Sequence, residues 1–272
     1  MKCTRPVLER CKTGPVELVE RPCGKCPACL SNRAQEWTYR LFAENKLYSK
    51  SCFVTLTYND EQLGARLVLS PTGLYSLNKK ELQDFMKRLR KNLSLRIRFY
   101  GVGEYGGQSK RPHYHLILFG VSREDRKVIE KAWPFGFVTV GDVSPASIAY
   151  VARYCTKKLF SDSLDYKAEG VLPEFSLMSN RPGIGYNAIK KGVRRSDDGS
   201  MFVWYQGRRF GVPKYFKEKI RTAYEAYVAR LRSISDRDAR FGDFQSSGRC
   251  ESAEQLQSEK NSLARLGSRR KV

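Results

Sequence analysis

Histidine is almost absent from this chain. Only two of its 272 residues are histidine, His113 and His115, and they stand two positions apart in the stretch RPHYHLILFG. The chain has no apolar run of about 18 residues, which excludes an ordinary membrane-spanning helix. Its polar, cysteine- and proline-containing N-terminus does not fit a signal peptide. It also lacks a Gly-x-x-x-x-Gly-Lys-Ser/Thr stretch, so no P-loop domain that hydrolyses nucleotides is expected.

Acidic side chains are scarce relative to basic ones. Fifty Lys and Arg residues against 28 Asp and Glu residues give a net charge of +22, and 12% of the residues are aromatic. This charge favours a polyanionic partner, because each neutralised phosphate releases counterions. Nucleic acid fits it better than the alternative of a generic basic protein. A hydrophobic content of 41% is enough for a globular body, either one large domain or a domain with additions.

Hydrophobic periodicity predicts alternating helices and strands. Helices are expected over about 31–48, 77–93, 122–132 and 145–159, and strands over about 51–58, 96–106, 113–120 and 135–143. Asn78 and Ser144 stand where helix N-caps are expected. This order is typical of an α+β fold with a central antiparallel sheet and the helices on one side. Residues 162–212 read as loop-rich, and a helix over about 213–235 forms a helical C-terminal extension.

Composition shifts suggest four parts of the chain. The expected parts are a cysteine-containing segment (1–30), a core (31–160), a loop-rich and helical extension (161–235) and a polar, disordered tail (236–272).

The histidine pair lies on an expected strand, where residues i and i+2 face the same way. His113 and His115 therefore point together, and such a pair suits a divalent metal ion. The alternative is a pair of satisfied core histidines. Glu104 stands nine residues before His113, and a hairpin turn near 106–111 would bring it to the pair as a third ligand. This mixed site suits Mg²⁺ or Mn²⁺, with zinc possible in vitro. Gly101, Gly103 and Gly106 match a dinucleotide-binding spacing, but no helix follows them, as that motif requires.

Two tyrosines share one face of the expected helix in SPASIAYVARYCTKKLF. Ile148, Ala152, Cys155 and Leu159 fall on one side of the helix, whereas Tyr150, Tyr154 and Lys157 fall on the opposite side. A core role for the tyrosines would place them on the apolar stripe. A phenol away from that stripe, with a lysine one turn along, is a candidate nucleophile.

Three of the eight cysteines form the stretch PCGKCPAC. Cys23, Cys26 and Cys29, with either Cys3 or Cys11 as a fourth thiolate, suit a structural zinc site. Free reduced thiols are the alternative. An iron–sulfur cluster fits less well, because Arg33 stands where the bacterial ferredoxin pattern has its fourth cysteine.

Several motifs together resemble a known family. The stretches FVTLTY, HYHLIL and YVARYCTKK resemble the three motifs of HUH endonucleases, which have a ferredoxin- or RRM-like fold. The ordered set CGKCPAC, CFVTLTYND, FMKRLRK, RFYGVGEYG, RPHYH, WPFGF, AYVARYCTKK and PEFSLMSNRPGIG is similar to the replication initiators of Microviridae of gokushovirus type. The resemblance covers about residues 20–215 and leaves the tail aside.

The resemblance implies a role for each motif residue. It implies that His113 and His115 bind a metal ion, that Tyr150 and Tyr154 are paired nucleophiles, and that Lys157 completes the tyrosine motif. Lys157 favours Tyr154 for the first cut. Glu104 as a ligand is only loosely supported by the family.

The implied activity is initiation of rolling-circle DNA replication. Such an enzyme nicks one strand at an origin, keeps the 5′ end on a tyrosine, leaves a 3′-OH primer and later religates the strand. The implied partners are single-stranded DNA, double-stranded replicative-form origin DNA, a host helicase and a host DNA polymerase, in the cytoplasm of a bacterial host and with no membrane. Candidate DNA contacts are Arg98, Lys110, Arg111, Arg153 and Lys158. The alternatives are an HUH transposase or plasmid relaxase, and a non-catalytic basic nucleic-acid-binding protein.

Overall fold

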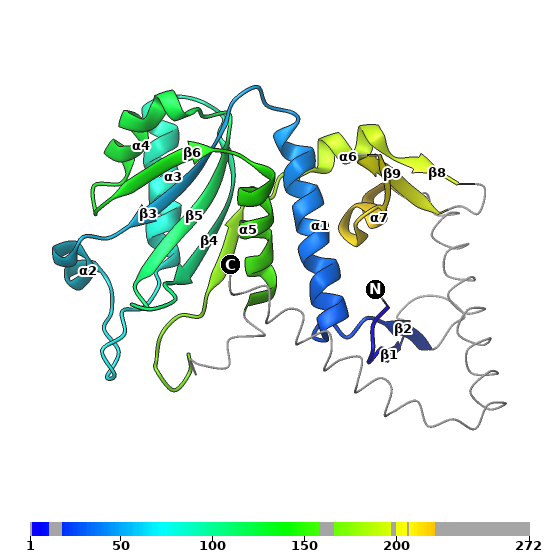
Figure 1. Ribbon diagram of the computed structural model, residues 1–272, viewed down its shortest axis with the longest axis horizontal. Helices are drawn as coiled ribbons and strands as arrows, with labels where there is room; N and C mark the ends of the chain where they lie inside the picture. The colour runs from blue at the N-terminus through cyan, green and yellow to red at the C-terminus, as the bar shows by residue number, and fades with distance from the viewer. Residues whose placement is uncertain (1, 11–17, 158–165, 197–199, 206, 221–272) are drawn as a thin grey trace. The chain divides into compact units, whose positions relative to one another are not determined.

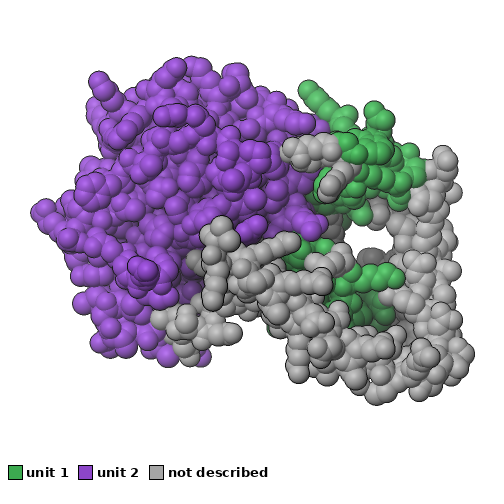
Figure 2. Space-filling view, in the orientation of Figure 1, with its two compact units in different colours: residues 1–33, 190–272 green, residues 34–189 purple. Residues whose placement is uncertain are grey.

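The structure is a computed structural model that describes residues 2–10, 18–157, 166–196, 200–205 and 207–220 (Figure 1). Two compact units can be distinguished, residues 34–189 and the described residues on either side of that range (Figure 2). The polar tail expected over 236–272 lies outside the described residues, as does the expected helix beyond Ile220.

A five-stranded sheet forms the centre of residues 34–189. Its strand order is β6-β3-β5-β4-β7, and every neighbouring pair is antiparallel. The strands are β3 (Ser51–Thr57), β4 (Arg98–Tyr105), β5 (Pro112–Phe119), β6 (Val138–Asp142) and β7 (Phe175–Met178). The α+β class and the antiparallel sheet predicted from the sequence are confirmed.

Helices cover both faces of this sheet, whereas the sequence suggested one. Helices α3 (Lys79–Leu93) and α4 (Arg126–Ala132) pack on one face, and α5 (Pro145–Lys157) packs on the other (Figure 1). The reason lies in β5, where Leu116 and Leu118 join one buried cluster while Ile117 and Phe119 join the other. Since successive strand residues point to opposite faces, an apolar run of this kind needs cover on both sides.

Polar caps fix where the helices begin. The Asn78 side chain accepts a hydrogen bond from Lys80 N at 3.0 Å, and Ser144 Oγ accepts one from Ser147 N at 3.1 Å. Both expected N-caps are therefore confirmed. The other elements before residue 160 are α1 (Pro27–Asn45), α2 (Asp60–Arg66) and the 3₁₀ helix η1 (Arg123–Asp125). None of the described helices combines the length and apolar composition that crossing a bilayer requires.

Short strands appear where the sequence suggested loops. Strand β7 pairs with β4, so the central sheet extends beyond the boundary expected at residue 160. A separate three-stranded sheet has the order β10-β9-β8, and β1 pairs with β2 in the segment expected to be irregular. Strands of two to five residues leave too little periodicity to read. These elements are β1 (Val7–Arg10), β2 (Leu18–Arg21), α6 (Tyr186–Gly192), β8 (Arg194–Arg195), β9 (Met201–Tyr205), β10 (Arg208–Gly211) and α7 (Lys214–Ile220).

Candidate functional site

The β4–β5 hairpin brings a carboxylate and two imidazoles together. Glu104 stands directly opposite His113 in the register of the two strands, and Val102 stands opposite His115. The turn between them is closed by hydrogen bonds from Gly106 N to Arg111 O and from Lys110 N to Gly106 O. The hairpin predicted from the sequence, with its turn near residues 106–111, is therefore present.

One carboxylate oxygen touches both histidines. Glu104 Oε1 lies 2.6 Å from His113 Nε2 and 2.8 Å from His115 Nε2. The three groups offer ligand atoms that all lie within 4.8 Å of one another. The Glu104 side chain is only 3% exposed. A six-coordinate ion with bonds of about 2.1 Å sets neighbouring ligands about 3 Å apart, so the three side chains already stand near that arrangement.

The second nitrogen of each imidazole is also held. His113 Nδ1 lies 3.1 Å from Arg111 O, and because a carbonyl oxygen only accepts, Nδ1 carries the proton of that bond. In the neutral ring this leaves a lone pair on Nε2 that faces the Glu104 oxygen. Two such groups at 2.6 Å require a cation between them, either a second proton on the ring or a metal ion. The arrangement therefore fits a cation-binding role.

The Glu104 carboxyl is held in its ionised form. Burial alone would raise its pKa, but hydrogen bonds with His113, His115 and Tyr154 outweigh burial and hold the pKa well below its usual range. A carboxylate that stays ionised at low pH is available as an anionic ligand.

Helix α5 presents its two tyrosines to this carboxylate. Ile148 and Ala152 on the same helix are buried against the sheet, whereas Tyr150 is 41% exposed. The Tyr150 O–H group donates to Glu104 Oε1 at 2.9 Å and lies 3.4 Å from His115 Nε2. The Tyr154 O–H group donates to the Tyr150 oxygen at 2.7 Å. The two phenols and the Glu–His–His group therefore form one connected set.

Both phenols are neutral as they stand. Burial raises the pKa of Tyr150 to about 12, although the hydrogen bond that it accepts from Tyr154 acts in the opposite direction. Burial and the negative charge of Glu104 raise the pKa of Tyr154 above its ordinary value. Positive charge beside the Tyr150 oxygen would be needed to ionise it.

The expected basic residues differ in what the structure says of them. Lys157 is the last residue of α5, and its side chain lies outside the description, as does the whole of Lys158. Arg153 is exposed on the same helix. Lys110 and Arg111 lie in the hairpin turn, where Arg111 pairs with Asp60.

Arg98 does not fit the prediction that it contacts DNA. Its side chain is buried, and its guanidinium donates to Glu44 Oε1 at 2.6 Å and to Pro182 O at 2.8 Å. Charge alone suggested a DNA contact, but the position is an internal ion pair that stabilises the fold.

Two residues near the site were missed in the sequence. Thr55 Oγ1 lies 2.9 Å from His115 Nδ1, and Phe53 stacks on the His115 ring with centroids 5.5 Å apart. Both lie on β3, where Thr55 stands opposite His115. The alternating threonines of SCFVTLTY were the available signal, but the register between two strands distant in sequence is not readable from either one.

A second group of ligand-type side chains lies in the N-terminal segment. The four Sγ atoms of Cys3, Cys23, Cys26 and Cys29 lie within 4.8 Å of one another. Cys3 therefore joins the three cysteines of PCGKCPAC, while Cys11 lies outside the described residues.

The fold and the site together define an α+β protein whose sheet carries a carboxylate, two imidazoles and two phenols at one place. A family model for replication-associated proteins of the ORF2 type matches residues 51–159, the stretch that contains all five of these side chains. No solved structure matches the chain.

Three curated relatives are similar to this chain. Replication-associated protein ORF2 of Spiroplasma virus 4 is 33% identical over 225 residues, which cover 75% of this chain and 68% of the relative. Replication-associated protein VP4 of Bdellovibrio phage phiMH2K is 29% identical over 216 residues, 72% of this chain and 66% of the relative. Replication-associated protein ORF4 of Chlamydia phage 1 is 26% identical over 226 residues, 74% of this chain and 53% of the relative. The chain belongs to this family of Microviridae-type phage replication-associated proteins.

Proposed function

We propose that this protein initiates rolling-circle replication by cutting one DNA strand at the phage origin and keeping the 5′ end on a tyrosine. The observation that carries the proposal is the position of the Tyr150 oxygen, 2.9 Å from Glu104 Oε1 and 3.4 Å from His115 Nε2. A nucleophile and a group of ligands for a divalent cation thus converge on one point. A protein that only binds DNA has no need of this convergence.

Glu104, His113 and His115 would hold the metal ion, and Mg²⁺ or Mn²⁺ suits this oxygen- and nitrogen-containing set. When bound, such an ion supplies positive charge that polarises the scissile phosphate and orients it. The fixed Nδ1 contacts of the two rings keep both Nε2 atoms directed at the site.

The cleavage step exchanges one phosphodiester for another. The Tyr150 oxygen forms a bond to phosphorus, the bond from phosphorus to the 3′ oxygen breaks, and the phenol proton is balanced by the proton that the departing 3′ oxygen gains. The product is a 5′-phosphotyrosine and a free 3′-OH. Attack of a 3′-OH on the phosphotyrosine reverses the exchange and rejoins the strand, without any external source of energy.

The hydrogen bonds favour Tyr150 for the first cut. Tyr154 donates to the Tyr150 oxygen, and Tyr150 donates to Glu104, so the Tyr154 bond stabilises a Tyr150 phenolate. This reverses the expectation from the sequence, which favoured Tyr154 because Lys157 completes its motif. Tyr154 would then act in the second exchange, which closes a round of replication.

The relatives' names support a role in replication rather than in transposition or plasmid transfer. In this role the protein acts inside the bacterial host, on single-stranded DNA and on the double-stranded replicative-form origin. A host polymerase extends the 3′-OH, and a host helicase unwinds the duplex, because this sequence contains no P-loop motif. Arg153 and Lys110 are candidate contacts to the strand.

The test is a cleavage assay on a labelled single strand and on supercoiled plasmid, both carrying the origin region, with Mg²⁺ or Mn²⁺ added. We expect a nicked product and a DNA-linked protein of increased mass. The His113→Ala and His115→Ala variants should bind the single strand but not cleave it. Binding by the wild-type protein without cleavage or adduct, in either metal, would favour the non-catalytic alternative.

A further inference from the structure

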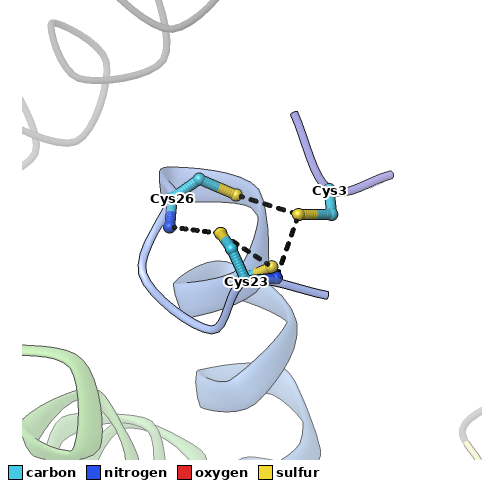
Figure 3. Close-up of side chains that lie close together, drawn as sticks. Cys3, Cys23 and Cys26 are labelled. Atoms are coloured by element: carbon cyan, nitrogen blue, oxygen red, sulfur yellow. Dashed lines mark hydrogen bonds between the residues drawn. The ribbon is translucent and has the colours of Figure 1, made fainter. Parts of the chain in front are cut away.

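We propose that Cys3, Cys23, Cys26 and Cys29 form a closed structural zinc site that holds the N-terminal segment together. The site is separate in the sequence and in its chemistry from the Glu–His–His group. It joins the start of the chain to the beginning of α1, where Cys26 immediately precedes the helix and Cys29 lies in its first turn (Figure 3).

The sulfur atoms already have the spacing of a tetrahedral site. Cys26 Sγ lies 3.8 Å from Cys3 Sγ, and Cys23 Sγ lies 4.0 Å from Cys29 Sγ. A tetrahedral zinc ion with Zn–S bonds of about 2.3 Å sets its sulfur ligands about 3.8 Å apart. A disulfide would need about 2.05 Å, so these pairs stand at the separation of ligands, not of bonded sulfurs.

Backbone N–H groups point at the sulfurs. Lys25 N and Cys26 N donate to Cys23 Sγ at 3.5 and 3.3 Å, and Cys23 N donates to Cys3 Sγ at 3.3 Å (Figure 3). Such bonds stabilise negative charge on sulfur, and the thiolate is the form that binds a metal ion. The turn around Gly24, which has a φ of 74°, gives the backbone the left-handed conformation that this approach uses.

The described part of this segment has little apolar material to hold it. Its buried cluster consists of Ala28 and the four cysteines. On β1, Val7 and Leu8 are 53% and 48% exposed. Cys3 and Cys23 flank the β1–β2 hairpin, so a metal ion bound by both would fasten its two ends. Small units of this kind commonly obtain their folding energy from a metal ion.

The ligand set selects zinc. Four thiolates leave no open coordination position, which is typical of structural zinc sites. A four-iron cluster binds each cysteine to a different iron atom and therefore holds the sulfurs farther apart than the ligands of one ion. Cys3 supplies the fourth sulfur, which the sequence had left open between Cys3 and Cys11.

The test is the metal content of the full-length protein, purified under anaerobic reducing conditions and analysed by mass spectrometry for metals. We expect one zinc ion per chain in the wild type and in Glu104→Gln, and loss of zinc in Cys3→Ser and Cys26→Ser. Cys52→Ala is the matched control, since Cys52 is buried in the sheet and should not affect zinc. Iron in place of zinc, no metal, or zinc that persists in both cysteine variants would overturn the proposal.

A spectrum of the wild type covers the case in which those variants fail to fold. Replacing the ion with Co²⁺ should give the strong visible absorption and the sulfur-to-cobalt charge-transfer band of a tetrahedral thiolate site. A spectrum of six-coordinate cobalt would contradict the four-cysteine assignment.

A second, independent observation concerns the sheet face that carries the histidines. Phe137 exchanges backbone hydrogen bonds with Thr57 at 3.0 and 3.1 Å, Thr57 stands opposite His113, and His113 stands opposite Glu104. Paired residues of antiparallel strands point to the same face, so these four side chains form one row. Phe137 ends the row and is 70% exposed.

We infer that Phe137 is a stacking platform for a base of the unpaired strand, an inference that rests on the proposed function. The buried residues of α5 pack with β4 and β5, whereas on the same face of β3 and β6, Thr55 and Thr57 are only partly buried and Thr139 is exposed. These small side chains leave room beside the ligand set for a strand. An aromatic face accepts any base, so it would grip DNA without selecting its sequence.

The test compares Phe137→Ala with Phe137→Trp by fluorescence anisotropy, with a labelled mixed-sequence oligonucleotide as a single strand and as a duplex. The alanine variant should bind the single strand about tenfold more weakly and the duplex unchanged, and tryptophan should restore binding. Val68→Ala is the control, since Val68 is 72% exposed but outside the row. Equal single-strand affinity in Phe137→Ala would overturn the platform alone, while absence of cleavage by the wild type would overturn the proposed function alone.

Discussion

Glu104 and His113 face each other across β4 and β5, and Glu104 Oε1 lies 2.6 Å from His113 Nε2. The His113 ring donates its other N–H group to Arg111 O, so the contact with Glu104 needs a cation to bridge it. The hairpin register thus sets up a cation site, and the connection from Glu104 to Tyr150 ties that site to the candidate nucleophile.

Glu104→Gln should nearly abolish cleavage while preserving single-strand binding. Glutamine keeps the shape of the side chain but removes the negative charge that balances the cation. Outer contacts of metal sites are worth about 10–100-fold in affinity, so loss of a direct ligand should cost at least about 100-fold. Titration of cleavage with Mn²⁺ measures the loss, and Glu124→Gln, at an exposed carboxylate, is the control. An unchanged Mn²⁺ dependence would remove Glu104 from the metal site.

Thr55→Val should weaken metal binding by about 10–100-fold, although Thr55 is a positioning residue that is not itself a ligand. The substitution is close in volume but removes the hydroxyl that lies 2.9 Å from His115 Nδ1. Thr55→Ser should restore the contact and most of the activity. Added Mn²⁺ should rescue Thr55→Val, which separates lost affinity from lost structure. A valine variant that needs no more metal than the wild type would contradict this role.

Arg98→Ala should destabilise the protein rather than weaken DNA binding. The substitution leaves Glu44 buried without its cation, and breaking a buried ion pair costs about 3–5 kcal/mol. Chemical denaturation measures the free energy of unfolding, and Arg153→Ala, at an exposed arginine, should change it by less than about 0.5 kcal/mol. Normal stability together with reduced DNA affinity in Arg98→Ala would restore the role first expected for Arg98.

The sequence was sufficient for features that depend on local periodicity. The alternation in HYHLIL gave the strand and the shared face of the two histidines, and the Asn78 and Ser144 caps gave two helix starts. The short spacing between Glu104 and His113 made their hairpin predictable. The pairing of Thr55 with His115 joins residues 60 positions apart, and neither stretch carries a signal for that register. Net charge likewise could not tell the buried Arg98 from an exposed arginine.

Gly136→Ala should destabilise the edge of the sheet beside the site. A Cβ atom at Gly136 would stand 2.5 Å from Asn59 N and 2.6 Å from the carbonyl carbon of Tyr58, and backbone atoms cannot move aside as side chains can. We expect a loss of about 1–3 kcal/mol, measured as a lower thermal midpoint. Gly141→Ala is the matched control, because a Cβ atom there meets nothing within 4 Å. Equal midpoints for the two variants would show that the β3–β6 edge yields without cost.

Tyr150→Phe and Tyr154→Phe should affect different steps. Each substitution removes one oxygen and little packing, but the Tyr150 oxygen is the one that bonds to Glu104 at 2.9 Å and accepts from Tyr154 at 2.7 Å. Tyr150→Phe should therefore lose most of the first cut. Tyr154→Phe should still nick once, more slowly because a bond that stabilises the phenolate is gone, and should fail to release closed circles. Losing one such donor costs about 10-fold or more, so the nicking rate of Tyr154→Phe should fall by about that factor. The double variant should form no adduct. Peptide mapping of the DNA-linked residue decides the assignment: an adduct on Tyr154 in the wild type after a single cut would reverse the order, and an adduct outside α5 would refute the tyrosine pair.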